Sequence, residues 1–145
     1  MGNGNDTLLL SRLCGSSGRV LSFDIQKQAL TNTEALLNKE QLPKNYTLIL
    51  DSHEHMDQYT ENTPVSCIIF NLGYLPGGDH NLAQKNETSI PALTKALSLL
   101  KKGGLLSLCI YSGGDSGFDE RDAVLAMASK PEPPVNFLVI KNRIL

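Results

Sequence analysis

The stretch Val65-Ser66-Cys67-Ile68-Ile69-Phe70-Asn71 decides the fold class, because it is a short apolar run closed by a polar amide. Near-continuous apolar character over about four to eight residues is typical of parallel strands that are covered by helices on both faces. Four other stretches share this character, namely residues 19–23, 47–50, 105–111 and 136–140. The sequence therefore predicts five strands that are buried on both faces.

Helical patterns separate these strands. Residues 26–41 carry an apolar stripe at helical spacing and are followed by Pro43. Three further helices are expected over residues 6–14, 87–102 and about 118–129, the last after a Ser-x-x-Asp capping pattern. Regular alternation of strand and helix predicts one α/β domain over residues 1–145. We expect a Rossmann-like, mostly parallel sheet in a three-layer α/β/α arrangement.

Composition restricts the function classes. The chain has 145 residues, of which 41% are hydrophobic and 19% charged, enough for one packed domain. No apolar run approaches the roughly 20 residues that cross a bilayer, so a membrane partner is not expected. The net charge of −2 argues against a globally basic nucleic-acid binder but allows a local basic face. The three cysteines show no metal or redox spacing, and we expect buried, reduced thiols in a cytoplasmic protein.

A polar group closes each of four consecutive strands. Asp24 follows the first, Asp51 the second, Asn71 the third, and residues 112–115 (Ser-Gly-Gly-Asp) the fourth. Ligands of open α/β sheets bind along the edge where the strands end. Asp and Asn also favour ordinary turns, which is the alternative for each position alone. The set of four favours a binding site.

A glycine-rich loop, residues 2–6, opens the first predicted helix. Its glycines allow close approach of a ligand, and the helix N-terminus adds partial positive charge. Asp24, about 20 residues further on, is placed to accept hydrogen bonds from ribose hydroxyls. The loop lacks the G-x-G-x-x-G spacing of dinucleotide binders, and no P-loop lysine is present. A nucleoside without a pyrophosphate fits better, and S-adenosylmethionine is the commonest such cofactor.

Residues 51–55 (Asp-Ser-His-Glu-His) contain potential metal ligands, and Asp57 and His80 could add to them. The spacing of His53 and His55 in a polar loop is unspecific. We therefore interpret this segment as a cofactor-contacting loop, with a solvated turn as the alternative, and expect no metal. The chain also lacks a G-x-S-x-G elbow, so no hydrolase nucleophile is apparent.

Residues 71–79 (Asn-Leu-Gly-Tyr-Leu-Pro-Gly-Gly-Asp) form the densest motif. The amide of Asn71 can accept hydrogen bonds from an N–H group, and Tyr74 offers a stacking or cation–π face. A planar or amine substrate would suit this pair. The alternative is a tight turn with Tyr74 packed over it.

Four segments taken together, residues 1–7, 23–26, 51–54 and 71–79, resemble the signature of one family. It comprises small class I S-adenosylmethionine-dependent methyltransferases long labelled rRNA methylases and now associated, under the name MnmM, with tRNA wobble-uridine modification. The resemblance implies methylation of the primary amine of 5-aminomethyl(-2-thio)uridine. The implied partner is the anticodon region of tRNA, with rRNA as a less favoured one and a homodimer as an option.

The resemblance also implies roles for individual residues. Asn3, Asn5 and Asp6 would line the methionine end of the cofactor, and Asp24 would hold the ribose with Gln26 beside it. Ser52 and His53 would border the adenine. Asn71 and Tyr74 would face the methyl group and the incoming amine. As a hypothesis, Asp79 or solvent takes the proton of the amine. Apart from the resemblance, anticodon contacts could come from Lys85, Lys95, Lys141 or Arg143, with a solvated face as the alternative for each.

The resemblance has departures at Ser112, where the family usually carries histidine, and at both ends. In the family the glycine-rich loop follows the first, central strand, whereas here it begins at Gly2. We therefore expect an N-terminally truncated domain that also lacks the family's C-terminal strand. Two strands would then have unpaired inner edges. An organelle would replace the cytoplasm as location if a transit peptide has been lost.

Two other functions stay open from the sequence. One is a truncated, catalytically weak methyltransferase-like domain that acts as a binding module. The other is a nicotinamide-dependent oxidoreductase.

Overall fold

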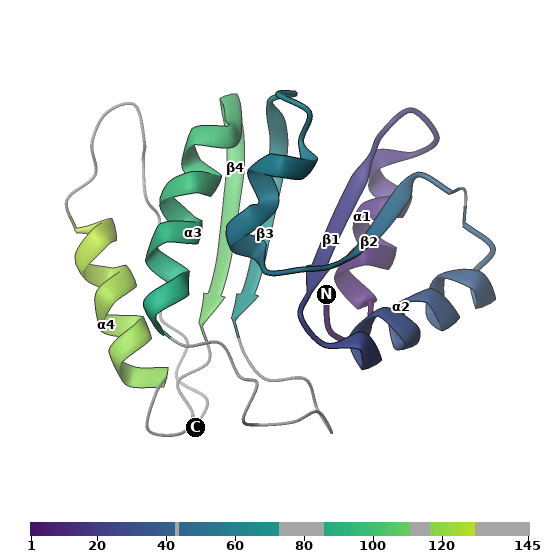
Figure 1. Ribbon diagram of the computed structural model, residues 1–145. Coiled ribbons are helices and arrows are strands. Elements are labelled where there is room, and N and C mark those ends of the chain that lie inside the picture. Colours follow the sequence, from purple (N-terminus) through teal and green to yellow (C-terminus); the bar gives the residue numbers. More distant parts are fainter. Residues whose placement is uncertain (43, 73–85, 111–116, 130–145) are drawn as a thin grey trace, which may run out of the picture.

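The computed structural model describes residues 1–42, 44–72, 86–110 and 117–129, and these confirm a Rossmann-like α/β fold (Figure 1). Helices and strands alternate along the chain, with one 3₁₀ helix, η1, between β2 and β3. In chain order the elements are α1 (Asn5–Cys14), β1 (Val20–Asp24), α2 (Lys27–Lys39), β2 (Tyr46–Leu50), η1 (His53–Tyr59), β3 (Val65–Leu72), α3 (Asn86–Leu99), β4 (Leu100–Ile110) and α4 (Gly117–Ala128).

The strands form two parallel pairs. β1 pairs with β2 from Val20↔Tyr46 to Asp24↔Leu50, and β3 pairs with β4 through Ile68↔Leu106 and Asn71↔Cys109. Within the described residues no ladder joins β1 to β3. The parallel direction brings the strand ends that carry Asp24, Asp51 and Asn71 to the lower edge in Figure 1.

The apolar core lies between the β3–β4 pair and the layer formed by α3 and η1. Its buried members are Met56, Phe70, Ala92, Leu93 and Ala96. Phe23, at the end of β1, packs against the same cluster. The core thus connects the end of β1 to the end of β3, and both strand ends carry predicted site residues.

Buried polar contacts fix α1 and α2 around β1. Thr7 and Ser22 place their hydroxyl oxygens 2.9 Å apart in the buried interior. Thr33, fully buried on α2, donates from Oγ1 to the Gly2 carbonyl at 3.3 Å. Asn45 donates from Nδ2 to the Gly15 carbonyl at 2.6 Å, past the end of α1. These bonds hold the glycine-rich turn and the helix after it in one place.

The expectation that the cysteines are buried is wrong. Cys14, Cys67 and Cys109 are all exposed. In β3 and β4, alternate side chains such as Ile68 and Phe70 face α3, which turns Cys67 and Ile69 to the opposite face. Ile69 is 37% exposed and Leu105 63% exposed, so these strands are covered on one face in the described structure.

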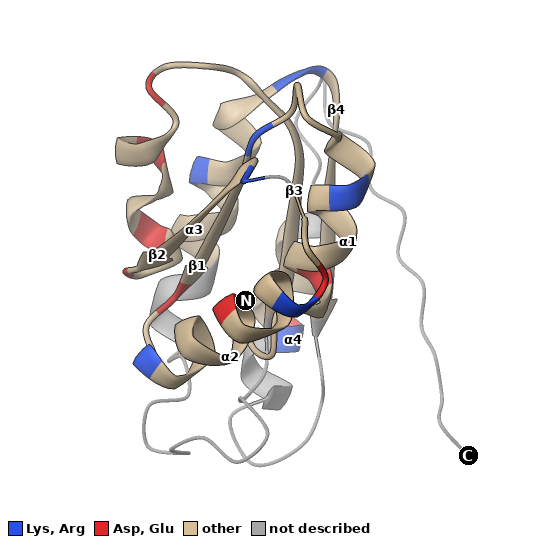
Figure 2. Cartoon of the chain, turned by 90° about the vertical axis from the view of Figure 1, so that its right-hand side faces the viewer, with Lys and Arg blue, Asp and Glu red and all other residues tan. Residues whose placement is uncertain are grey.

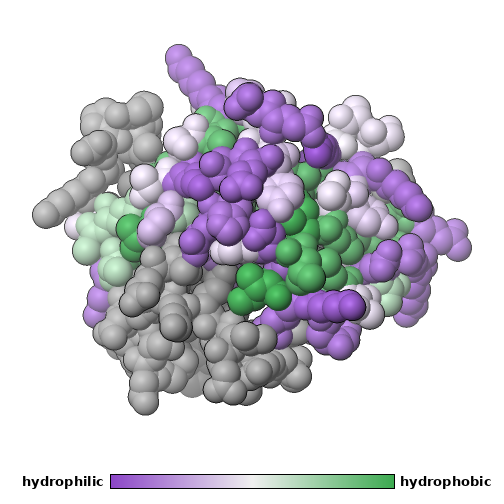
Figure 3. All heavy atoms as spheres, viewed as in Figure 1, coloured by the Kyte–Doolittle hydropathy of each residue, from purple (hydrophilic) through white to green (hydrophobic). Residues whose placement is uncertain are grey.

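Apolar side chains are also exposed beside η1. In Figure 3 an apolar area lies next to the polar surface of η1, where Figure 1 shows β1 and β2. Ile25, after β1, is 41% exposed, and Leu50, at the end of β2, is 52% exposed. Both lie at the sheet edge that carries the predicted site.

The third and fourth predicted helices and the fourth strand are found, with one shifted boundary. The helix expected over residues 87–102 ends at Leu99, because Leu100 already pairs with Val65 at the start of β4. Gly103, in the expected helix-end sequence, has φ +76° within the strand. The predicted strand 136–140 lies outside the described residues.

Candidate functional site

The glycine-rich turn before α1 depends on Gly4. This residue is the N-cap of α1 with φ 88° and ψ 1°, a left-handed conformation that other residues rarely adopt. It is buried against α2, where an added Cβ would lie 2.9 Å from Thr33 Cα. Glycine is therefore required at this position for two reasons, and the turn places the backbone N–H groups of the first turn of α1 at the sheet edge.

The predicted cofactor residues of this turn are held by neighbouring elements. Asn3 accepts a hydrogen bond from Asn32 Nδ2 of α2 at 3.0 Å. Asp6, in the first turn of α1, accepts one from Asn71 Nδ2 at the end of β3. Asn5 is exposed at the start of α1. The Asp6–Asn71 bond brings together two predicted motifs that are 65 residues apart in sequence.

Asp24 ties the end of β1 to the glycine-rich turn. Its Oδ2 accepts from Gly2 N at 3.0 Å and from the amino group of Met1 at 3.1 Å. Its Oδ1 accepts from Gln26 N, at the N-cap of α2, at 3.0 Å. A carboxylate offers about four acceptor positions, so capacity for a further donor is left.

Asp51 organises the start of η1, the element that carries Ser52 and His53. Its Oδ1 accepts from Ser52 N at 2.7 Å and lies 2.8 Å from His55 Nδ1. Its Oδ2 accepts from the hydroxyl of Tyr59 at 2.8 Å. The hydrogen bond with His55, followed by that from Tyr59, lowers the pKa of Asp51. The ionised carboxylate of Asp51 thus connects the beginning of η1 to its end at Tyr59.

Two edge-on ring contacts connect η1 to the strand ends. His53 meets Phe70 with ring centroids 5.4 Å apart, and Tyr59 meets Phe23 at the same distance. Burial lowers the pKa of His53, which favours the neutral imidazole. η1 therefore contacts the residue immediately before Asp24 and the residue immediately before Asn71.

The structure gathers most of the predicted site at one edge. Around the start of α1 lie Asn3, Asn5, Asp6, Asp24, Gln26 and Asn71, and Ser52 and His53 begin η1 nearby. The predicted residues Tyr74 and Asp79 lie outside the described residues, as do His80 and Ser112. In the described ranges no group of three or more Asp, Glu, His or Cys side chains is arranged to hold a metal ion.

The supporting role of three residues at this edge was not predicted from the sequence. Asn32 and Thr33 of α2 bind the glycine-rich turn, and the amphipathic spacing of α2 could have predicted that one of its faces meets that loop. Lys95 of α3 binds η1, for which the sequence carries no signal. Lys95 donates to the Glu54 carbonyl and to Asp57 Oδ1, so its assignment as an anticodon contact is not supported. Lys85, Lys141 and Arg143 lie outside the described residues.

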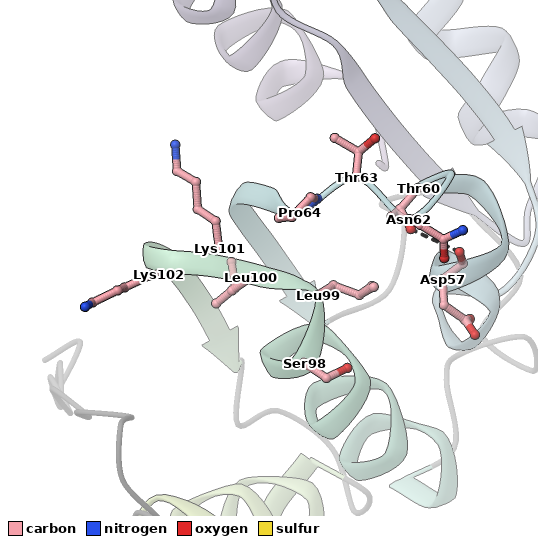
Figure 4. A pocket seen from close by; sticks show the side chains of 10 residues that line it. All are labelled: Asp57, Thr60, Asn62, Thr63, Pro64, Ser98, Leu99, Leu100, Lys101 and Lys102. Carbon is pink, nitrogen blue, oxygen red and sulfur yellow. Dashed lines mark hydrogen bonds between the residues drawn. The ribbon is translucent and has the colours of Figure 1, made fainter.

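A separate pocket of about 600 Å³ lies at the opposite edge, where β3 and β4 begin (Figure 4). No predicted site residue lines it. Its lining residues are Asp57, Thr60, Asn62, Thr63, Pro64, Ser98, Leu99, Leu100, Lys101 and Lys102. The side chains of Lys101 and Lys102 extend outward from it.

Charge gives no strong indication of an RNA-binding face. Basic and acidic residues are interspersed over the described part of the ribbon in Figure 2. Two of the arginines shown there are paired, Arg12 with Glu40 and Arg19 with Glu61.

Comparison with known proteins identifies the family. A family model described as "Putative rRNA methylase" matches residues 20–144. The chain belongs to this rRNA methylase family. An Arabidopsis thaliana protein named "tRNA (mnm(5)s(2)U34)-methyltransferase, chloroplastic" is 37% identical over 140 residues, which cover 88% of this chain and 50% of that protein. The chain thus spans about half the length of this curated relative.

Solved structures that are similar in sequence to this chain have the same fold. A "putative rRNA-methylase" from Clostridium thermocellum is 44% identical with a TM-score of 0.86, covering 97% of this chain and 78% of that one. A "putative methyltransferase" from Streptococcus mutans, solved in complex with SAH (S-adenosylhomocysteine), is 37% identical with a TM-score of 0.79. That match covers 92% of this chain and 70% of the other.

The described part of this family member contains no helix that is both long enough and apolar enough to cross a membrane.

Proposed function

We propose that this rRNA methylase family member is an S-adenosylmethionine-dependent RNA methyltransferase. Its proposed substrate is the primary amine of 5-aminomethyl(-2-thio)uridine at the wobble position of tRNA. The observation that carries the proposal is the Asp6–Asn71 hydrogen bond, which joins the cofactor motif to the substrate motif at one sheet edge. The names of the relatives from Arabidopsis and Streptococcus mutans support substrate and cofactor respectively.

The residues at this edge fit a nucleoside-containing sulfonium cofactor. The first turn of α1 offers backbone N–H groups to the carboxylate of the methionine part. Asp24 has acceptor capacity left for a ribose hydroxyl. His53 favours the neutral form, which avoids a second positive charge near a sulfonium. We assign adenine contacts to Ser52 and His53, and methionine-end contacts to Asn3, Asn5 and Asp6, with Gln26 beside the ribose.

When bound, the cofactor supplies an electrophilic methyl group. The protein mainly has to present a neutral amine in line with it, and such positioning can contribute several kcal/mol, about 7 or more in favourable cases. Asn71 suits this task because its Nδ2 is engaged by Asp6, which leaves Oδ1 to accept a hydrogen bond from the amine. In this proposal Tyr74 stacks on the substrate, and Asp79 or solvent takes the amine proton.

Two measurements test the proposal. Calorimetric titration with S-adenosylhomocysteine should show binding by the folded protein. Incubation with S-adenosylmethionine and tRNA that bears the aminomethyl uridine, followed by nucleoside mass spectrometry, should show a mass gain of one methyl group at that nucleoside. Binding of S-adenosylhomocysteine without methylation of either tRNA or rRNA would support the binding-module alternative. No binding of S-adenosylhomocysteine but retention on immobilised NAD would favour the oxidoreductase.

The binding-module alternative is favoured by one structural observation. β1 and β3 are not joined by a ladder in the described residues, and the site spans the gap between them. For the location we propose the cytoplasm, with an organelle as the alternative, because the name of the Arabidopsis relative includes the word chloroplastic.

A further inference from the structure

η1 is a short 3₁₀ helix whose internal hydrogen bonds are intrinsically weak, so its position depends on side chains. Asp51 anchors it from its own N-terminal side. From the neighbouring layer, Lys95 of α3 reaches across and donates to the Glu54 carbonyl and to Asp57 Oδ1, the latter at 2.7 Å. The two acceptors belong to the first and middle parts of the same 3₁₀ helix.

Lys95 is built into the α3–η1 contact rather than lying free on the surface. Its side chain is 33% exposed, and Asp57 is 44% exposed. The hydrogen bond from Lys95 lowers the pKa of Asp57, so the Asp57 carboxylate is ionised at neutral pH. On either side of Lys95 along α3 lie Ala92, Leu93 and Ala96, which are buried core residues. These buried neighbours hold the backbone of Lys95 in place, and with it the base of the side chain that carries the ammonium group.

The contacts of Lys95 with η1 matter because Ser52 and His53, the residues assigned to the adenine, lie at the start of η1. Ser52 caps η1 by accepting from Glu54 N at 3.3 Å, and Glu54 is the residue whose carbonyl Lys95 holds. His53 lies between them and contacts Phe70, the residue before Asn71. A displacement of Glu54 would therefore move both residues assigned to the adenine.

We propose that Lys95 is a positioning residue for cofactor binding, which clamps η1 through Glu54 and Asp57 so that Ser52 and His53 face the adenine. This inference rests on the proposed cofactor function. Lys95 itself touches neither cofactor nor substrate. A lysine suits the task because its ammonium has three donors that can be divided between a carbonyl and a carboxylate on one turn.

The test compares Lys95→Met, which keeps the apolar stem and removes the charge, with Lys101→Met as matched control. Lys101 is an exposed lysine of β4 that forms no ion pair with any described residue. Titration with S-adenosylhomocysteine should show about fivefold weaker binding for Lys95→Met and no change for Lys101→Met, because a partly exposed charged hydrogen bond contributes modestly. Lys95→Arg should restore part of the affinity.

Hydrogen exchange without cofactor provides a second readout. Backbone amides of residues 54–59 should exchange faster in Lys95→Met than in the wild type, while amides of α2 stay unchanged. Unchanged exchange in η1, or equal affinities of Lys95→Met and wild type, would overturn the proposal. If the wild type binds no S-adenosylhomocysteine, the proposed function itself fails. This result is distinct from measurable binding that is equal in Lys95→Met and the wild type, which overturns only the role of Lys95.

Discussion

Single residues at this site are constrained by neighbours that lie far away in sequence. Gly4 is held against Thr33, Asp24 against Gly2 and Asp6 against Asn71. Each of these contacts links a residue of the glycine-rich turn or the first turn of α1 to another element. Substitution of Gly4 should therefore affect mainly the stability of the fold, whereas substitution of Asp6 should affect mainly the rate of methylation.

Gly4→Ala should destabilise the fold strongly. The new Cβ would meet Thr33 Cα at 2.9 Å in addition to the strain of the left-handed conformation, and we expect a loss of about 2 to 4 kcal/mol in the free energy of unfolding. Gly15→Ala is the control, since Gly15 also has positive φ (63°) but nothing within 4 Å of an added Cβ, so that only backbone strain of about 1 to 2 kcal/mol is expected. Urea unfolding measures both. Equal losses would contradict the close contact with α2.

Asp6→Ala should reduce catalysis more than cofactor binding. Without the acceptor of Asp6, the amide of Asn71 loses the bond that orients it. A hydrogen bond to a charged group contributes roughly 1.5 to 3 kcal/mol, so kcat should fall by about 10- to 100-fold. Single-turnover methylation of tRNA measures the rate, and calorimetry measures the affinity for S-adenosylhomocysteine. An unchanged rate would contradict the role of Asp6 in orienting Asn71.

At the scale of elements, the sequence predicted those whose local pattern agrees with their packing. α1, α2, α4 and the strands β1, β2 and β3 were located to within a few residues, because apolar patterns and helix-ending residues coincide there. η1 was not predicted, since residues 53–59 bury only Met56 and show no apolar stripe. The start of β4 was taken as the end of a helix, because its pairing with Val65 is a long-range contact.

The same distinction applies to the site. Residues that end strands could be assigned from the sequence, because parallel strands bring their ends to one edge regardless of side-chain detail. For Asn32 and Thr33 the sequence could have predicted only that a face of α2 meets the glycine-rich loop, and for Lys95 it carried no such signal, because the partners of these residues depend on how helices pack. Burial of Cys67 was predicted wrongly for a related reason: an apolar run does not reveal which face of a strand is covered.

η1 should make stability depend on pH through His53. Its pKa is lowered by burial, so the unfolded chain, with a histidine pKa of about 6.5, binds a proton that the folded chain resists. Stability should therefore fall as pH decreases from 7.5 to 5.5, by no more than about 1.4 kcal/mol per pH unit. Urea unfolding of wild type and His53→Gln tests this.

The His53→Gln variant should lack this slope in the same pH window. A slope that persists would assign the effect to another group. The pKa of Asp51 is also lowered in the folded protein, so ionised Asp51 stabilises the fold at every pH above its pKa in the unfolded chain. This contribution is lost only in acid, below about pH 4. The two contributions are thus separated in pH.

At the scale of the whole molecule, two parallel pairs share a core on one side and leave apolar side chains exposed elsewhere. α3 and η1 cover one face of β3 and β4, while Cys67, Ile69 and Leu105 are exposed on the other. Ile25 and Leu50 add exposed apolar area near the site. In the described structure, helices therefore cover one face of the β3–β4 pair and leave the other face exposed.

Thiol chemistry provides a direct test of this arrangement. Cys14, Cys67 and Cys109 are exposed, so a small thiol reagent such as 5,5′-dithiobis(2-nitrobenzoic acid) should titrate all three in the native protein. The denatured protein gives the reference value. Slow or incomplete reaction at Cys67 or Cys109, located by peptide mass spectrometry, would show that this face of the sheet is covered.

The separation of β1 from β3 has a consequence for how the molecule unfolds. The described connections between the two strand pairs include Phe23 in the core, the rings on η1 and the Asp6–Asn71 bond, rather than a continuous ladder. A ligand that contacts Asp24 on one pair and Asn71 on the other would act as a crosslink between them. Its binding would then couple the two strand pairs more tightly, so that saturation with this ligand should raise the midpoint of the thermal transition and make the transition sharper.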